Sequence, residues 1–245
     1  RYGPSGSEYL ATNCKVLAAN LIRCLTVPGV GGNLVWVVSI AGQVSPSSIV
    51  TTNYAPPTIL SIVPSTGNTD GTTVVTIYGQ NFATDTNPTI YFDGKMVPVL
   101  SSGLDLLKFL APEAVAVENI LYAVHVTVGG QVSDPQTFSY LPPVIYSVNV
   151  FIHSNGSTIL NIIGSFFSLK PIVHIDVNGV DNVPSCPLKS HYEINCIIDM
   201  KKGDVTVWTN VATSNMKSFQ YGEPLVLYST LLTGLALTSG YTDSN

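Results

Sequence analysis

Charged side chains are scarce in this sequence. Among 245 residues there are 10 Lys and Arg and 15 Asp and Glu, so 10% of the chain is charged and the net charge at pH 7 is −5. The basic residues nowhere form a cluster that could neutralise several phosphates, so we expect no nucleic-acid partner. Disordered chains combine low hydrophobicity with high net charge, whereas 45% of these residues are hydrophobic. The chain is therefore expected to fold.

The sequence also lacks the apolar spacing of an amphipathic helix. Only Leu104–Leu110 follows that spacing, and it is too short for a stable helix. Alternating or β-branched runs are frequent instead, for example Thr73–Tyr78, Tyr122–Val128 and Asp204–Trp208. Turn residues separate these runs. The pattern predicts an all-β fold of small antiparallel sandwiches with about seven short strands each.

The sequence contains no recognisable catalytic motif. The histidines are His125, His153, His174 and His191. None has a Ser, Cys or carboxylate at the spacing of a catalytic motif, and no Gly-x-Ser-x-Gly occurs. Residues 29–32 lack the third glycine and the lysine of a phosphate-binding loop, and residues 68–71 have too few oxygen ligands for calcium. We expect no enzymatic activity, no cofactor and no bound metal.

Cysteine is rare, but its spacing is informative. Cys14 and Cys24 are ten positions apart, and so are Cys186 and Cys196. Neither pair has the Cys-x-x-Cys spacing of a zinc site. The spacing favours two short-loop disulfides, each worth about 2 to 3 kcal/mol, over four buried free thiols. Disulfides would imply an oxidising, extracellular setting.

Three further segments bear on the cellular setting. Asn155-Gly156-Ser157 is an N-glycosylation sequon in a predicted loop, with an ordinary Asn-Gly turn as the alternative. Residues 1–4 show no apolar leader, so we expect that the start has been processed or cut away. The uncharged run Pro224–Thr242 contains several Ser and Thr residues, which favours a strand-rich segment over a membrane span.

A repeat of about 85 residues runs through the chain. The stretch Pro57–Phe82 recurs over residues 143–167, with Gly79 and Gly164 at the same place in each. Asp93-Gly94 and Asn178-Gly179 stand between alternating apolar runs and predict tight hairpins.

Later segments of the unit recur as well. Residues 40–45 are similar to 128–133, and the closing segment 53–57 is similar to 139–143. These markers divide the chain into four parts. They are 1–55, the C-terminal part of one unit; 56–141, a complete unit; 142–222, a further unit; and 223–245, the possible start of another.

Residues 57–82 resemble the signature of IPT/TIG domains, the immunoglobulin-like domains of plexins, of the hepatocyte growth factor receptor family and of some transcription factors. They share a proline, alternating apolar residues, Pro-x-x-Gly, a glycine at position 71 and then Thr-x-Val-Thr-Ile-x-Gly-x-x-Phe. The second copy is looser, with Val150 in place of Pro64. The resemblance implies tandem sandwiches with Phe82 in the core, and with Gly71 and Gly79 where the chain turns sharply.

The low charge, the richness in Thr, Ser, Asn, Val and Ile, and the Cys-x9-Cys pairs resemble one group of such proteins, the tiger-type adhesion and allorecognition receptors of social amoebae. The resemblance implies a cell-surface ectodomain, anchored through a segment outside this sequence, that binds another cell-surface or extracellular protein, either homophilically or heterophilically. The Pro-Pro junctions at 56–57 and 142–143 favour a semi-stiff rod.

An alternative is a structural or carbohydrate-binding module of a secreted or wall-associated protein. Exposed aromatic side chains could then stack on sugar rings. The candidates are Trp36, Tyr78, Tyr91 and Trp208. Each stands in a strand run, where packing in the core or across strands is the more frequent role.

Overall fold

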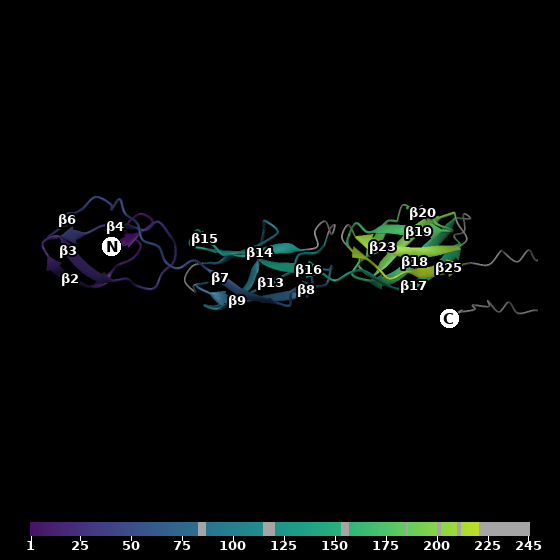
Figure 1. Cartoon of the computed structure of the whole chain (residues 1–245), viewed down its shortest axis with the longest axis horizontal. Coiled ribbons are helices and arrows are strands. Elements are labelled where there is room, and N and C mark those ends of the chain that lie inside the picture. Colours follow the sequence, from purple (N-terminus) through teal and green to yellow (C-terminus); the bar gives the residue numbers. More distant parts are fainter. Residues whose placement is uncertain are drawn as a thin grey trace, which may run out of the picture.

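The computed structural model describes residues 1–82, 87–114, 121–152, 157–184, 186–199, 202–209 and 212–220. Every regular element in these ranges is a strand, which confirms the predicted all-β class. Three bodies follow one another in a row, in sequence order (Figure 1). The described ranges hold no helix with the length and hydropathy that a membrane crossing needs. The run Pro224–Thr242 and the predicted unit 223–245 lie outside the described residues.

The first body has short strands and almost no aliphatic core. Its strands are β1 (Tyr2–Gly3), β2 (Thr12–Ala18), β3 (Leu21–Leu25), β4 (Val35–Trp36), β5 (Ser39–Ile40) and β6 (Gln43–Val44). They pair as β1 with β4, β2 with β3, and β5 with β6. Tyr2 and Leu34 are the buried hydrophobic residues of 1–55. The ring of Tyr2 stacks on Trp36 with centroids 4.3 Å apart and contacts Tyr9 and Tyr54, so aromatic rings hold this body together.

The central body is a sandwich of two sheets. One sheet has the order β12-β13-β9-β7 and the other β11-β10-β14-β16-β8, with β15 paired to β14. The strands of the first sheet are β7 (Thr58–Val63), β9 (Val74–Gln80), β12 (Val99–Ser102) and β13 (Leu106–Leu110). Those of the second are β8 (Thr66–Gly67), β10 (Thr89–Phe92), β11 (Lys95–Val97), β14 (Tyr122–Val128), β15 (Gln131–Val132) and β16 (Gln136–Tyr140).

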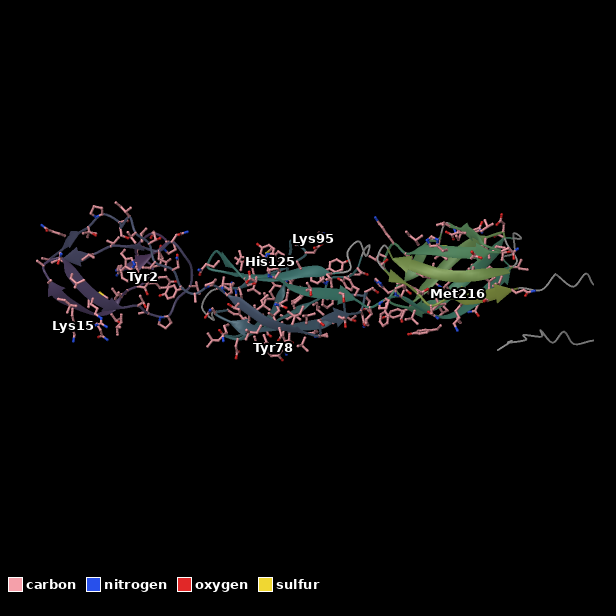
Figure 2. All side chains as sticks on the ribbon, in the orientation of Figure 1. Tyr2, Lys15, Tyr78, Lys95, His125 and Met216 are labelled. Atoms are coloured by element: carbon pink, nitrogen blue, oxygen red, sulfur yellow. A yellow bond between two sulfur atoms is a disulfide. The ribbon has the colours of Figure 1, made fainter. Side chains whose placement is uncertain are left out.

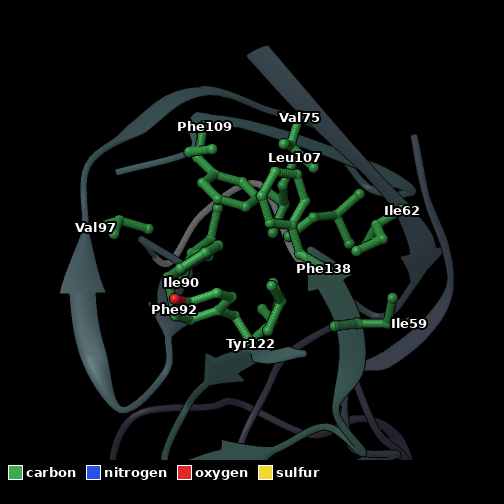
Figure 3. Close-up of a cluster of buried hydrophobic side chains, with 14 of the residues drawn as sticks. Ile59, Ile62, Val75, Ile90, Phe92, Val97, Leu107, Phe109, Tyr122 and Phe138 are labelled. Carbon is green, nitrogen blue, oxygen red and sulfur yellow. The ribbon is translucent and has the colours of Figure 1, made fainter. Parts of the chain in front are cut away.

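Strict alternation in the sequence creates the core between these sheets. Along β14, every second side chain from Tyr122 to Val128 is buried, while Ala123, His125 and Thr127 face outward. Figure 3 shows the resulting cluster, in which Phe109 and Phe138 meet side chains from both sheets. Phe82 is fully buried in this cluster, as the family resemblance implied.

The third body is a second sandwich with its own core. Its sheets have the orders β17-β18-β22-β21 and β20-β19-β23-β24, with β25 paired to β23. The strands are β17 (Val144–Ile152), β18 (Thr158–Ser165), β19 (Ile172–Val177), β20 (Val180–Asn182), β21 (Leu188–Ser190), β22 (Glu193–Ile198), β23 (Lys202–Thr209), β24 (Ala212–Thr213) and β25 (Lys217–Gln220). Phe167 and Cys196 are fully buried in this core.

The two Xaa-Gly hairpins form as the sequence predicts. Asp93 and Gly94 both have positive φ and join β10 to β11, and Asn178 with Gly179 joins β19 to β20 in the same way. Positive φ at both central residues gives a turn whose twist matches that of the flanking strands.

Gly79 is required for a different reason from the one the sequence suggests. Gly71 does adopt a positive φ of 75°, but Gly79 lies inside β9 and is not among the positive-φ residues. A Cβ at Gly79 would lie 2.1 Å from the Thr58 carbonyl oxygen and 2.3 Å from Cζ of Phe82. The expectation of a sharp turn at Gly79 is therefore wrong, because Gly79 continues the strand. Glycine is needed there because neighbouring atoms leave no space for a Cβ. Gly164 is confined in the same way by Val144 and Phe167.

A serine closes the same hairpin in all three bodies. The hydroxyl oxygens of Ser45, Ser133 and Ser214 accept hydrogen bonds from backbone N–H groups at 3.0, 3.0 and 2.9 Å. Each serine directly follows the two-residue second strand of its hairpin (β6, β15 or β24) and stands seven residues after the residue whose N–H it accepts. The sequence comparison found the first two serines and missed Ser214.

Candidate interaction surface

The first and central bodies meet through glycine backbone. A Cβ on Gly129 would lie 2.7 Å from the backbone nitrogen of Gly31. The backbones of the two bodies therefore touch at two glycines, where neither residue carries a side chain. Val30 packs against the core cluster of the central sandwich. The amide of Gln131 donates to the Tyr54 carbonyl at 3.0 Å. Residues 29–32, which were considered above for phosphate binding, are thus part of a junction between bodies.

Tyrosines near the end of each of these two bodies are fixed by their hydroxyl groups. Tyr140 donates to the Pro112 carbonyl at 2.5 Å, and burial raises the pKa of its hydroxyl. Tyr54 donates to the Val27 carbonyl and shares a second hydrogen bond with Tyr2 at 2.5 Å. The chain therefore leaves each body from an anchored position.

The central and third bodies are joined by a set of polar contacts, which we call the latch. It consists of Thr69, Asp70, Glu113, Ala114, Phe167, Leu169, His191 and Tyr192. Thr69 Oγ1 donates to the Phe167 carbonyl at 3.0 Å in a buried position, and the Leu169 N–H donates to the Ala114 carbonyl at 3.0 Å. These bonds fix the 68–71 loop and Ala114 of the central body against the third body.

His191 lies at the centre of the latch and is buried. Its Nδ1 faces the Phe167 carbonyl, and its Nε2 lies 2.7 Å from Oε1 of Glu113. Both partners are acceptors, so the ring donates to both only when it carries two protons. The Glu113 side chain is half exposed, so its contact with His191 contributes at most about 1 kcal/mol.

Asp70 and Tyr192 form the outer contact of the latch. The Tyr192 hydroxyl donates to Oδ2 of Asp70, while Thr72 holds Oδ1 through its backbone N–H and its hydroxyl. Burial raises the pKa of Asp70, but these hydrogen bonds outweigh it and hold the pKa below its usual value. The contribution of Asp70 is thus present at neutral pH and is lost as the pH falls through that lowered pKa.

Weakening the latch should loosen the angle between the two sandwiches. We expect Thr69→Val combined with Asp70→Ala to leave the melting temperature of each sandwich nearly unchanged, because neither side chain lies in an apolar core. The loss of a buried hydrogen bond and of the Tyr192 contact should broaden the distribution of molecular dimensions in small-angle X-ray scattering.

A control for this experiment is Lys189→Ala. Lys189 forms an ion pair with Glu193 at 2.9 Å, but both residues belong to the third body. A scattering profile of the double variant identical to those of the wild type and of this control would show that the latch does not fix the angle.

The candidate sugar-stacking side chains lie in different surroundings. Tyr78 is on the outer face of β9 and is 44% exposed, and Figure 2 shows it pointing away from the central sandwich. Tyr91 stacks on His125 on the outer face of the other sheet, with centroids 4.9 Å apart and 10° between the planes. Trp36 stacks on Tyr2 and donates from Nε1 to Thr52 at 3.0 Å, which is a packing role. The side chain of Trp208 lies outside the described part.

The structure pairs the four cysteines as the spacing favours. Cys14 is bonded to Cys24, and Cys186 to Cys196. The first disulfide lies in the exposed β2–β3 hairpin, and the second lies at the edge of the third core. Asn155 and His153 lie outside the described residues, so the predicted glycosylation site stays a prediction.

The three histidines of the described residues have local contacts. His174 Nδ1 lies 2.7 Å from Oδ2 of Asp181 on the neighbouring strand, whereas His125 belongs to the ring stack and His191 to the latch. Across the described ranges, no three His, Cys, Asp or Glu side chains are placed to hold a metal ion. Residues 68–71, considered above for calcium, form one side of the latch.

These features define a protein built of immunoglobulin-like β-sandwiches in tandem. Residues 57–140 match the family model of the IPT/TIG domain, so the central sandwich is an IPT/TIG domain. This agrees with the resemblance drawn from its signature residues.

Several solved structures are similar in part. Two structures of the plexin A4 extracellular region align with 18% and 15% identity over 68% and 84% of this chain, with TM-scores of 0.32 and 0.37. They are matched over only 18% and 20% of their own length. A surface glycan-binding protein from Prevotella bryantii aligns with 14% identity over 69% of this chain and 42% of its own, with a TM-score of 0.40. These alignments assign no ligand to this chain.

Proposed function

We propose that this chain is a segment of an extracellular recognition array, of the kind found in tandem IPT/TIG cell-surface receptors, that binds another cell-surface or extracellular protein. The observation that carries the proposal is the latch. It joins one sandwich to the next through hydrogen bonds between residues up to 122 positions apart in the sequence. A rigid row of sandwiches holds a binding surface at a set distance from its anchor.

The covalent and electrostatic features support the same proposal. Two disulfides suit an oxidising medium outside the cell. Only 10% of the residues are charged, and many large hydrophobic side chains are exposed on the sandwiches, for example Leu60, Val74 and Met96. Such surfaces fit contacts with proteins better than electrostatic contacts with phosphates. In this proposal the chain has no catalytic role.

The proposal predicts adhesion by the isolated chain. Beads coated through one terminus with this chain should either cluster with one another or capture cells that display its partner. Matched beads coated with the same density of an unrelated immunoglobulin-like domain are the control. Clustering within one bead population would indicate homophilic binding, and capture of cells alone would indicate heterophilic binding.

The experiment has a clear negative outcome. If the coated beads neither cluster nor capture cells above the control level, while circular dichroism shows intact β structure, the recognition proposal fails. Binding of the beads to immobilised glycans, lost in Tyr78→Ala or Tyr91→Ala, would favour the carbohydrate-binding alternative instead.

A further inference from the structure

β17 is the longest strand of the described chain, and one of its edges has no partner strand. It pairs along its whole length with β18. On the other side, β25 lies near it in the opposite sheet but pairs with β23 only. Within the described ranges, β18 is therefore the only strand that pairs with β17.

The direction of the free backbone groups follows from the register. The N–H of Gly164 in β18 donates to the Tyr192 carbonyl, away from β17. Directions alternate along a strand, so Ile162, Leu160 and Thr158 also direct their backbone groups away from β17. Their partners in β17 are Val148, Val150 and Ile152, in that order. These three residues therefore present their N–H and C=O groups at the open edge.

The start of the same edge is already occupied by a side chain. Asn215 accepts a hydrogen bond from the Ile145 N–H at 2.7 Å and donates to the Ile145 carbonyl at 2.9 Å. A bulge between Ile145 and Ser147 follows. The open stretch is therefore the second part of the strand, from Ser147 to Ile152.

Natural proteins protect open edges with lysine, proline, charges or short strands. The other open edges of the two sandwiches carry such devices: Pro64 after β7, Lys95 in β11, Asp181 in β20, Lys189 in β21, Lys217 in β25, four residues only in β12, and two only in each of β8, β15 and β24. The open stretch of β17 from Ser147 to Ile152 has none of these. The nine residues of β17 contain no charge and no proline, and Phe151 and Ile152 are 51% and 62% exposed.

The central sandwich shows how the equivalent edge is closed. In β7 a bulge separates Ile59 from Ser61, and Val63 pairs with Thr76. The equivalent pair in the third body is Asn149 with Asn161, so Pro64 corresponds to Val150. After Pro64 the chain crosses to β8, which pairs with β16 in the other sheet. With valine at this position, β17 runs straight on and its edge stays open.

The outer face of this sheet carries a row of asparagines that ends at the open edge. Asn149, Asn161 and Asn195 stand opposite one another on three neighbouring strands. Asn161 Nδ2 donates to Oδ1 of Asn195 at 2.7 Å and to Oε1 of Glu193 at 2.8 Å. An asparagine side chain both donates and accepts hydrogen bonds, so Asn149 at the end of this row can bond to an asparagine at the end of an identical row.

We propose that the open edge of β17 binds the same edge of a second copy of this chain, antiparallel, with Asn149 opposite its own counterpart. Val148 of each copy then faces Val150 of the other, which forms four backbone hydrogen bonds and joins two four-stranded sheets into one. The strand is uncharged, so no like charges meet along the new pair. The inference rests on the proposed function and names its partner as homophilic.

The first test is the oligomeric state of the complete chain in sedimentation velocity over a range of concentrations. We expect the wild type to dimerise. Val150→Pro should raise the dimer dissociation constant by about tenfold or more, because it removes one N–H donor from each copy. The pairing with β18 does not use that N–H, and proline already stands at the equivalent position 64. Asn149→Lys, on the solvent face, should have the same effect by placing two ammonium groups opposite each other.

The second test is cross-linking. Asn149→Cys should form a disulfide-linked dimer under mild oxidation, because directly opposed Cβ atoms lie about 5 Å apart. Ser101→Cys is the matched control, since it also stands in an uncharged edge strand with its side chain exposed. A wild type that stays monomeric at every concentration, equal dimerisation of Val150→Pro, or equal cross-linking of both cysteine variants would each overturn the proposal.

The outcomes separate this inference from the proposed function. A monomeric wild-type chain whose coated beads still capture cells would refute pairing through β17 and leave heterophilic recognition intact. Dimerisation in solution without any bead clustering or cell capture would support the strand pairing and refute adhesion.

Discussion

Replacing Gly79 with alanine should unfold the central sandwich at a much lower temperature. The added Cβ would lie 2.1 Å from a backbone oxygen of β7, which cannot move aside as the end of a side chain could. Overpacking costs about 1 to 3 kcal/mol, and we expect the upper end of that range here. For a domain of this size, the loss lowers the melting temperature by roughly 12 to 24 °C. Differential scanning calorimetry of the complete chain would show one transition shifted.

Gly103→Ala is the matched control. Its nearest neighbour is the Leu106 carbonyl oxygen, 3.6 Å from the added Cβ, so alanine fits there without displacing anything. Gly164→Ala should reproduce the effect of Gly79→Ala in the third sandwich, since its Cβ would also lie 2.1 Å from a backbone oxygen. Equal stability of Gly79→Ala and Gly103→Ala would contradict the steric explanation.

The second large effect is expected from the disulfide of the third sandwich. Replacing both Cys186 and Cys196 with alanine should destabilise that sandwich by about 3 kcal/mol, because the cross-link no longer restricts the unfolded chain. Cys196 is fully buried, so the loss of its sulfur atom adds a small cavity. Thermal unfolding followed by circular dichroism would measure the shift.

The other disulfide provides the comparison. Cys14 and Cys24 join two strands whose side chains are almost all exposed. Their replacement by alanine should loosen that hairpin, because an isolated two-stranded ribbon is barely stable, and should leave the melting of both sandwiches unchanged. If the variant without Cys186 and Cys196 has the same melting temperature for the third sandwich as the variant without Cys14 and Cys24, the buried disulfide is dispensable for stability.

Local features of the fold could be predicted from the sequence. The hairpins at Asp93-Gly94 and Asn178-Gly179 depend on two adjacent residues, and the inward side of β14 depends on alternation over seven. The cysteine pairs could be inferred because each spans only ten positions. In each of these cases, a short stretch of sequence contains all the information.

Features that depend on distant residues could not be predicted. The latch joins Thr69 to Phe167 and Asp70 to Tyr192, which are 98 and 122 positions apart, and no motif marks either pair. The role of Gly79 was misjudged because the atom that excludes a side chain belongs to another strand. The sequence repeat did not reveal Ser214, because the residues around it differ from those around Ser45 and Ser133, although it accepts the same backbone hydrogen bond.

The two junctions differ in the chemistry of their contacts. The contact of Gly31 with Gly129 involves no ionisable group, whereas the other joins Asp70 to Tyr192 and Glu113 to His191. Acidity or high salt therefore acts on the second junction and leaves the first as it is. We therefore expect a change in acidity or salt to alter the angle between the central and third bodies, and to leave the angle between the first and central bodies unchanged.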